Sequence, residues 1–332
     1  MEMRYSFIIP VYNRPEEVHE LLESFQNITF SEEYEIVIIE DGSSEPCDSV
    51  IGNFKELPIS YYIKANSGPG PSRNYGMKMA KGNYFIILDS DCLLPPHYLL
   101  EVDSSLKETY VDFYGGPDAA HKDFTPVQKA INYTMTSLFT TGGIRGRSEG
   151  INAFQPRSFN MGISKEAFVA SGGFGKIHPG EDPDLTLRLW KLGYKSKLIS
   201  KAFVYHKRRI SWNKFYQQVR KFGLVRPILN SWHPKSSKIT YWFPFCFLVY
   251  FLISIITLIS SFILPMTLLI FYLILICIDS TIRNKSLYIG VLSIWATLIQ
   301  FLGYGSAFIE STFHIQWSKK LPQKQFPHLF FE

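Results

Sequence analysis

The feature that most constrains the fold is a run of forty consecutive uncharged residues, from Ile239 to Ile278. As a helix rising about 1.5 Å per residue, this run is about 60 Å long, twice the roughly 30 Å of a bilayer's hydrocarbon core. Pro265 lies within the run and fits the turn of a helical hairpin. A soluble domain does not expose so much contiguous apolar surface. The run therefore predicts a hairpin of two membrane-spanning helices over about residues 239–280.

A third uncharged stretch, from Ser286 to Ile309, is also long enough to cross a membrane. Lysines precede the hairpin, and Arg283 and Lys285 follow it, so the positive-inside rule places both of its ends in the cytoplasm. A third complete span would place the lysines of the following tail outside, against that rule. The stretch is therefore either a full span or a re-entrant segment. We expect a transmembrane region over residues 239–310 and a polar and aromatic tail over 311–332.

Before the transmembrane region, short apolar runs alternate with helical segments of 10–15 residues. This alternation predicts an α/β domain, a mostly parallel sheet with helices on both faces. The first apolar run is too short for a signal peptide, so we expect the front of the chain to stay in the cytoplasm. The expected strands cover residues 5–11, 34–39, 59–63, 84–88, 111–115, 157–163 and 202–205.

Charge and cysteine usage exclude several other classes of protein. The net charge is only +5, and Lys and Arg form no long run, so no nucleic-acid partner is expected. The four cysteines show no CxxC pair and no metal-ligand spacing. Neither a disulfide framework nor a zinc site is therefore indicated.

Two acids follow the central apolar strand, Tyr84–Leu88. Asp89 and Asp91 are two residues apart, which on extended backbone points them to one side with Cα atoms roughly 6.5–7 Å apart. Two carboxylates at this spacing repel each other unless a cation lies between them, and a hard divalent ion prefers such oxygen ligands. The alternative is that one of the acids caps the helix expected near Pro96. Both interpretations remain open on this evidence.

The segment from Gly68 to Arg73 is rich in glycine and proline. It is not a dinucleotide fingerprint, because Arg73 stands where the third glycine belongs and the loop precedes the central strand. No P-loop pattern occurs either, so a nicotinamide enzyme and a P-loop nucleotidase are both disfavoured. Arg73 at the start of a helix is suited to meet a phosphate or a base. The alternative is a surface arginine beside glycines needed for packing.

Acids also open an amphipathic helix later in the chain. Acids in a first turn can simply complement the helix dipole, which accounts for Asp184. Glu181 and Asp182 follow a glycine-rich approach, which also fits a catalytic carboxylate on a closing loop. His206 ends a later strand and precedes three cations, so it is either a structural histidine or a metal ligand.

Residues 118–156 follow a looser pattern than the rest of this domain. They contain an expected helix, Pro126–Phe139, and a loop rich in Gly and Arg, Gly142–Arg147. Long irregular loops in compact domains are usually functional or mobile. We interpret this region as a lid on the acceptor side, with a disordered surface excursion as the alternative.

Several of these motifs occur in an order that is typical of one family. These motifs are Pro10-Val-Tyr-Asn13, Glu40-Asp-Gly-Ser43, Gly68–Asn74, Asp89-Ser-Asp91, Gly180-Glu-Asp182 and His206. With them, residues 4–225 resemble the family-2 glycosyltransferases, which implies a GT-A fold, a nucleotide-sugar donor and a Mg²⁺ or Mn²⁺ cofactor.

The resemblance also implies roles for individual residues. Asp41 resembles the acid that meets the uracil or ribose of a UDP-sugar, and Asp91 and His206 resemble the metal ligands at the diphosphate. Asp182, with Glu181 beside it, resembles the catalytic base. The implied donor-binding set is Pro10, Tyr12, Asn13, Asp41, Asn66, Arg73, Asp89, Arg157, Gln217 and Arg220.

The last two residues of that set belong to a motif that departs from its pattern. Gln217-Gln-Val-Arg220 is similar to the QxxRW motif of processive cellulose- and hyaluronan-type synthases, but Lys221 replaces the tryptophan. This departure argues against a processive polymerase. Aromatic and basic residues interleave over 210–235, which predicts interfacial helices that close a catalytic domain of residues 1–232.

Together these features predict a membrane-anchored, inverting glycosyltransferase that takes a sugar from a nucleotide sugar, expected to be a UDP-sugar. Its expected acceptor is a lipid-linked saccharide or glycolipid at the cytoplasmic face of the cell membrane, in cell-surface polysaccharide or glycoconjugate assembly. One alternative is a polyprenyl-phosphate glycosyl synthase, in which Asp182 would be dispensable as a base. A second alternative is an inactive module that binds sugar nucleotides for an assembly complex. Intact Asp89, Asp91 and Asp182 argue against that module.

Overall fold

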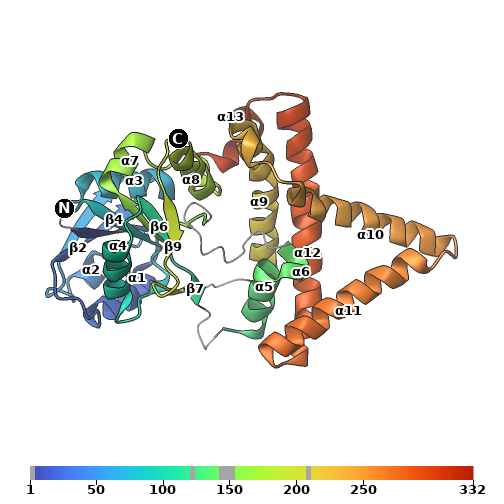
Figure 1. Ribbon diagram of the computed structural model, residues 1–332, viewed down its shortest axis with the longest axis horizontal. Helices are drawn as coiled ribbons and strands as arrows, with labels where there is room; N and C mark the ends of the chain where they lie inside the picture. The colour runs from blue at the N-terminus through green and yellow to red at the C-terminus, as the bar shows by residue number, and fades with distance from the viewer. Residues whose placement is uncertain (1–3, 120–123, 142–153, 207–210, 332) are drawn as a thin grey trace. The chain divides into compact units, whose positions relative to one another are not determined.

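The computed structural model describes residues 4–119, 124–141, 154–206 and 211–331. The chain divides into two compact units. The first, called here the sheet unit, comprises residues 1–121, 147–207 and 330–332. The second, called the helical unit, comprises residues 122–146 and 208–329. Figure 1 shows the elements of each unit in the colours of their sequence order.

The sheet unit is built on a mixed seven-stranded sheet. Its strands are β1 (Tyr5–Val11), β2 (Tyr34–Asp41), β3 (Ile59–Lys64), β4 (Tyr84–Leu88), β6 (Phe113–Gly115), β8 (Asn160–Ser164) and β9 (Ser196–Leu198), in the order β3-β2-β1-β4-β8-β6-β9. The first four in this order pair in parallel, whereas β8 runs antiparallel to both β4 and β6. The carboxyl ends of β1 to β4 therefore meet at one edge, where open α/β sheets bind ligands.

Helices cover both faces of this sheet, because successive strand residues alternate between two apolar clusters. Phe7 and Ile9 of β1 pack with α1 (Pro15–Gln26) and α4 (Tyr98–Glu108). Ile8 packs on the other face, with α3 (Pro69–Met79), α7 (Lys165–Ser171) and α8 (Glu181–Lys191). The short helix α2 (Asp48–Ile51) adds to the first cluster. The sheet unit thus has the doubly covered architecture that the sequence predicts (Figure 1).

A small second sheet follows the central strand. It contains β5 (Cys92–Leu93), β7 (Asp118–Ala119) and β10 (Val204–His206), with β10 in the middle. β10 runs antiparallel to β5 and parallel to β7. Because β5 begins shortly after Leu88, this sheet starts from the carboxyl end of β4.

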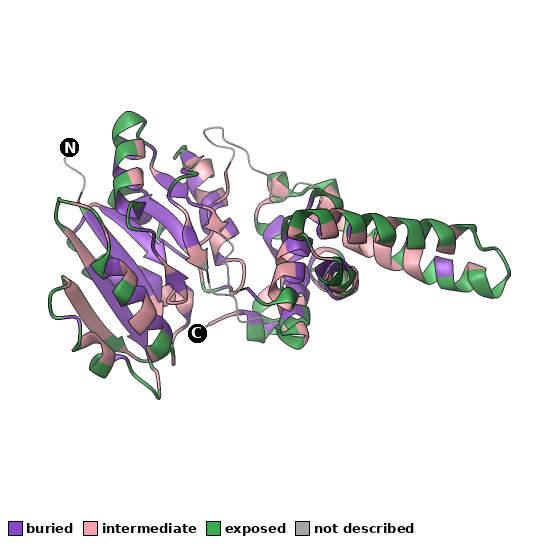
Figure 2. Cartoon of the chain, turned by 90° about the horizontal axis from the view of Figure 1, so that it is seen from below, coloured by how far each residue is buried: buried purple, intermediate pink, exposed green. Residues whose placement is uncertain are grey.

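The helical unit contains three helices that are long and apolar enough to cross a membrane, by length and composition: Ile239–Ile259, Leu264–Asn284 and Leu287–Trp317. Large apolar side chains along the first two are exposed, among them Ile256 and Phe271 (Figure 2). The elements of this unit are α5 (Pro126–Thr136), α6 (Leu138–Thr141), α9 (Trp212–Trp232), η1 (Pro234–Ser236), η2 (Ile239–Trp242), α10 (Phe243–Ile259), α11 (Leu264–Asn284), α12 (Leu287–Ser311), η3 (Thr312–Trp317, a π-helix), α13 (Pro322–Gln325) and η4 (Pro327–Leu329).

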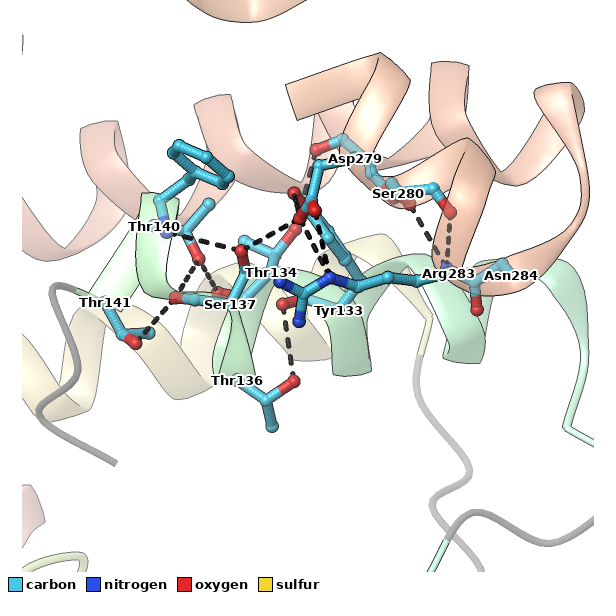
Figure 3. Close-up of polar contacts among 12 residues, drawn as sticks. Tyr133, Thr134, Thr136, Ser137, Thr140, Thr141, Asp279, Ser280, Arg283 and Asn284 are labelled. Atoms are coloured by element: carbon cyan, nitrogen blue, oxygen red, sulfur yellow. Dashed lines mark hydrogen bonds and ion pairs between the residues drawn. The ribbon is translucent and has the colours of Figure 1, made fainter. Parts of the chain in front are cut away.

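Polar groups join α5 and α6 to α11 (Figure 3), and the Thr134 hydroxyl of α5 lies 3.4 Å from the Thr297 hydroxyl of α12. The Tyr133 hydroxyl donates to Asp279 Oδ2 at 2.7 Å, and Arg283 Nε donates to Asp279 Oδ1 at 3.0 Å. Ser280 and Ser293 exchange a hydrogen bond of 2.7 Å between α11 and α12. In an apolar surrounding such polar groups need partners within the protein, and here they find them.

The helical unit refines several predictions. Pro265 lies in the first turn of α11, just after the turn of the hairpin, and the third uncharged stretch is one continuous helix. The helix expected over 126–139 forms as α5 and groups with the helical unit. The interfacial segment expected after residue 210 is one helix, α9, in the same unit. The loop 142–147 lies outside the described residues.

Candidate active site

Asp41, the last residue of β2, fixes the loop that leads into α3. Its side chain is buried, and its two carboxylate oxygens accept hydrogen bonds of 2.9 Å from the backbone N–H groups of Ser67 and Gly68. Lys64 Nζ lies 2.5 Å from Asp41 Oδ1 and neutralises the buried charge. Asn66 donates from its side chain to the Asp41 carbonyl at 2.8 Å. Asp41 and Asn66 therefore shape the turn before α3.

Asn13 makes a similar link between the ends of β1 and β2. Its φ of 53° is in the left-handed region, which asparagine tolerates better than most residues. Its Oδ1 accepts from the backbone N–H groups of Ser44 at 2.8 Å and Glu45 at 3.1 Å. Pro10 lies one residue before the end of β1, and Tyr12 follows the strand with an exposed side chain. These predicted donor residues thus lie at the carboxyl edge of the parallel strands.

Arg73 is the charged centre of the site. It is only 3% exposed on α3, and its guanidinium bridges two carboxylates from different elements. Nη2 donates to Asp89 Oδ1 at 2.7 Å, and Nη1 donates to Glu181 Oε1 at 3.2 Å. Its guanidinium carbon also lies 5.3 Å from the centre of the Phe174 ring. Arg73 therefore joins the end of β4 to the start of α8, and it is a buried cation and not a surface arginine.

Glu181 is held by two basic partners. Besides Arg73, His178 contacts it, with Nδ1 at 2.9 Å from Glu181 Oε1. Burial alone would raise the pKa of Glu181, but the hydrogen bond and charge of His178 and the charge of Arg73 lower that pKa to about 2. A carboxylate with so low a pKa is a weak base at neutral pH.

The pKa of Asp182, the next residue, shifts in the opposite direction. Burial, and after it the negative charge of Glu181, raise the pKa of Asp182 to about 6. The charges of Arg73 and Arg157 and a hydrogen bond from Ser158 oppose this rise without cancelling it. One carboxylate oxygen, Oδ1, is buried with no hydrogen-bond partner. Two neighbouring acids whose pKa values are driven apart are a common arrangement for acid–base chemistry.

Of the two predicted metal ligands, His206 ends strand β10 of the small sheet and Asp91 lies in the turn before β5. His206 of β10 pairs across the antiparallel ladder with Cys92 of β5, and Asp91 directly precedes Cys92. Among the described residues, no group of three or more His, Cys, Asp or Glu side chains is arranged to hold a metal ion. A carboxylate and an imidazole fit Mn²⁺ or Mg²⁺ only as a partial ligand set, which oxygen atoms of a substrate would complete. The cations that follow His206, residues 207–209, lie outside the described residues.

The remaining predicted residues are more dispersed. Arg157 forms an isolated antiparallel bridge with Asn160 in the sheet unit. Gln217 and Arg220 lie on α9 in the helical unit, where Arg220 Nη2 pairs with Glu310 Oε2 at 2.6 Å. The predictions did not include His178, although an acid three residues after a histidine is a detectable pairing signal.

The sheet unit therefore gathers Arg73, Asp89, Glu181 and Asp182 beside the carboxyl ends of parallel strands. A doubly covered sheet with an acidic site at the carboxyl edge of its parallel strands is the arrangement in which open α/β proteins bind their ligands. Residues 6–170 match the family model described as "Glycosyl transferase family 2". The chain therefore carries a family 2 glycosyltransferase domain.

Curated relatives have related descriptions. The poly(ribitol-phosphate) β-N-acetylglucosaminyltransferase TarP of Staphylococcus aureus is 35% identical over 132 residues, which cover 39% of this chain and 40% of TarP. The poly(ribitol-phosphate) β-glucosyltransferase of Bacillus spizizenii is 34% identical over 115 residues, covering 33% of this chain and 18% of that protein. The chain thus spans less than half the length of these relatives.

Solved structures confirm the predicted GT-A fold. The mannosyltransferase PcManGT from Pyrobaculum calidifontis, in complex with GDP-Man and Mn²⁺, has a TM-score of 0.63 at 14% identity, covering 96% of this chain and 89% of that one. A structure of TarS from S. aureus in complex with UDP-GlcNAc has a TM-score of 0.50 at 17% identity, covering 95% and 92% of the two chains. At these identities the likeness concerns the fold alone.

Proposed function

We propose that this protein is a membrane-anchored, inverting glycosyltransferase that moves a sugar from a UDP-sugar to a lipid-linked saccharide or glycolipid. The observation that carries the proposal is Asp182, a half-buried carboxylate with an unpartnered Oδ1 and a raised pKa. A sugar hydroxyl is a poor nucleophile at neutral pH, and it needs a positioned base of this kind.

In the proposed reaction, an acceptor hydroxyl oxygen attacks the anomeric carbon on the face opposite the diphosphate. The new C–O bond forms as the bond to the diphosphate oxygen breaks, so the anomeric configuration inverts and UDP leaves. The hydroxyl proton passes to Asp182 Oδ1. Glu181 and Arg73 do not take the proton; they fix the start of α8, which presents Asp182.

A divalent ion fits the chemistry of the leaving group. Asp91 and His206 would hold Mg²⁺ or Mn²⁺, which neutralises charge on a departing diphosphate. Arg73 and Asp89, already paired at 2.7 Å, would lie at the sugar side of the donor. The other residues proposed to bind the donor lie at the strand ends: Pro10, Tyr12, Asn13, Asp41 and Asn66. Arg157, whose charge acts on Asp182, is proposed to bind it as well. Gln217 and Arg220, which lie on α9 in the helical unit, stay predictions from the sequence motif alone.

The choice of UDP-sugar and of a lipid acceptor has separate support. TarS forms a complex with UDP-GlcNAc, and TarP is described as an N-acetylglucosaminyltransferase. Three helices of this chain are long and apolar enough to cross a membrane, which suits an acceptor that is itself in the bilayer. We place the catalytic domain on the cytoplasmic side of the cell membrane, following the lysines and arginines at the ends of the hairpin.

Replacement of Asp182 tests this proposal. Asp182→Asn keeps the size and removes the basicity, so we expect normal nucleotide-sugar affinity and a single-turnover transfer rate lower by about 10²–10⁴-fold. Asp184→Asn is the matched control, since it removes another acid from the first turn of α8. Asp184 pairs with Arg188 at 2.9 Å. This control therefore measures how far loss of a negative charge near the start of α8 affects transfer through the helix dipole or through folding. We expect Asp184→Asn to transfer sugar within a few-fold of wild type per folded molecule.

The outcome also separates the rival reactions. A lipid phosphate is already ionised and needs no base, so near-normal transfer by Asp182→Asn would indicate a polyprenyl-phosphate glycosyl synthase. No transfer by the wild type with any donor, despite nucleotide binding, would indicate an inactive binding module.

A further inference from the structure

A short segment far along the chain docks next to the candidate site. Residues 330–332 belong to the sheet unit, although residues 208–329 form the helical unit. Phe330 forms an antiparallel bridge with Ile177, and the Phe331 N–H donates to the Lys176 carbonyl at 3.0 Å. Ile177 is 2% exposed, so the segment pairs with a buried part of the loop before α8. The segment Phe330–Phe331 thus pairs with the loop that leads into α8.

The Phe331 ring touches two parts of the site at once. Its centre lies 5.9 Å from the centre of the His178 ring, the partner of Glu181. On another side it lies directly against Gly68, where an added Cβ would come within 2.3 Å of two ring carbons. Gly68 has a φ of +87°, and its N–H binds Asp41. The ring therefore requires a glycine at residue 68 and contacts both sides of the site.

Contacts from α3 already join the same two regions. The side chain of Asn74 donates to the Phe174 carbonyl and accepts from the Phe174 N–H, each at 2.8 Å. Arg73 adds the ionic link to Glu181. The contacts of Asn74 and Arg73 come from α3 itself. The contact of Phe331, in contrast, depends on a segment far later in the chain.

His178 needs a neighbour of this kind. Its side chain is 40% exposed even with Phe331 beside it, so its rotamer depends on neighbouring contacts such as those with Glu181 and Phe331. An aromatic ring against that imidazole restricts it without supplying a charge. The geometry suits a positioning role and not a proton-transfer role for Phe331.

We propose that Phe331 is a positioning residue of the donor site, which holds His178 against Glu181 and keeps the Gly68 turn in the conformation that binds a nucleoside diphosphate sugar. The proposal rests on the proposed function for the identity of the donor. It adds a residue that the motifs of the catalytic domain do not contain. Productive donor binding then requires the segment Phe330–Phe331 to be docked on the sheet unit.

The first test uses Phe331→Ala in the full-length protein in detergent. Lys176 is exposed and its carbonyl binds Phe331, so trypsin cleavage after Lys176 reports docking without any substrate. We expect cleavage several-fold faster than in wild type, UDP affinity about tenfold weaker, and transfer slower by roughly ten- to a hundredfold. Phe331→Tyr should restore all three. Leu321→Ala removes another large apolar side chain of the same tail, 60% exposed, and should change none of them.

The second test uses the contact with Gly68. Gly68→Ala should weaken UDP binding through both the clash with Phe331 and the backbone strain. In the double variant Gly68→Ala with Phe331→Ala the clash is absent, so the two effects should combine less than additively. Strict additivity in UDP affinity would contradict contact between these residues in the functional state.

Other outcomes overturn the proposal outright. Phe331→Ala with wild-type cleavage and wild-type UDP affinity would show that Phe331 has no positioning role. Faster transfer by Phe331→Ala would show that the ring obstructs the site. A wild type that binds UDP but transfers no sugar would overturn the transfer reaction alone, since cleavage and affinity are measured without an acceptor. A wild type that binds no nucleotide would overturn both proposals.

Discussion

At the scale of single residues, Glu181 and Asp182 are neighbours in one helical turn, yet their surroundings move their pKa values in opposite directions. His178 and Arg73 surround Glu181 and lower its pKa to about 2. Burial and the negative charge of Glu181 raise the pKa of Asp182 to about 6. Two adjacent carboxylates with different charged neighbours can therefore serve one as an anchor and the other as a base.

The raised pKa predicts how transfer depends on pH. Asp182 must be ionised to accept a proton, so single-turnover transfer should be constant above about pH 6–7 and fall about tenfold per pH unit below about 6. Asp182 binds its proton more tightly in the folded state than in the unfolded state. Its contribution to stability should therefore increase as the pH falls through 6, while transfer declines. A thermal unfolding midpoint that falls together with the rate over pH 7 to 5 would contradict this assignment.

The proposed metal ligands predict a dependence on Mn²⁺. Asp91→Ala removes a carboxylate from the proposed diphosphate site, so the gain in UDP affinity on adding Mn²⁺ should vanish in the variant. Calorimetric titration of UDP with and without Mn²⁺, followed by EDTA, measures that gain. Asp118→Ala, an acid on the neighbouring strand β7, is the comparison. Equal enhancement by Mn²⁺ in wild type and Asp91→Ala would remove Asp91 from the site.

At the scale of elements, the strands and helices of the sheet unit follow from local patterns. The apolar runs 5–11 and 84–88 form the predicted strands, because their residues fit a sheet that is buried on both faces. The amphipathic pattern after Gly180 forms α8. Strand ends differ more, since β8 begins at Asn160 and not near Arg157. Boundaries depend on tertiary contacts that no local pattern contains.

Two aspects of the site depend on contacts between residues far apart in the chain. The bridge from Arg73 to Glu181 joins residues 108 apart, and the motif spacing does not specify that pair. The docking of Phe331 beside His178 has no counterpart in any local pattern. The helix of residues 126–136 illustrates the same limit. Its periodicity predicts a helix, but it groups with the helical unit through residues far along the chain, as in the packing of Ile131 with Phe215 and the hydrogen bond of Tyr133 with Asp279.

Close packing of α3 on the sheet predicts a stability effect. A Cβ on Gly76 would come within 2.4 Å of Ile39 Cδ1 and 2.8 Å of Ile8 Cγ2, both in the core. We expect Gly76→Ala to destabilise the protein by about 1–3 kcal/mol, as overpacking does. Gly52→Ala is the control, since its Cβ would meet only backbone oxygens at 3.6 Å. The loss is read from the midpoint of thermal unfolding in detergent, and equal midpoints for the two variants would contradict the packing described here.

At the scale of the whole molecule, the chain combines a GT-A sheet unit with helices suited to a bilayer. The forty uncharged residues predict the hairpin because no soluble fold would expose them. We therefore expect the full-length protein to stay in the membrane pellet after extraction at alkaline pH with sodium carbonate. A peripheral membrane protein of the same cells should be released under those conditions and serves as the control. Release of this protein into the supernatant would contradict membrane-spanning helices.

The central claim is that this chain transfers a sugar from a nucleotide donor to a lipid acceptor, and one measurement tests it most directly. Purified full-length protein is incubated with Mn²⁺, a membrane lipid extract and each of a panel of radiolabelled UDP- and GDP-sugars. The account predicts that at least one UDP-sugar releases UDP and labels the organic-phase lipid in equal amounts, and that Asp182→Asn does neither at a comparable rate. Label that never enters lipid with any donor, or equal labelling by Asp182→Asn, would contradict the account.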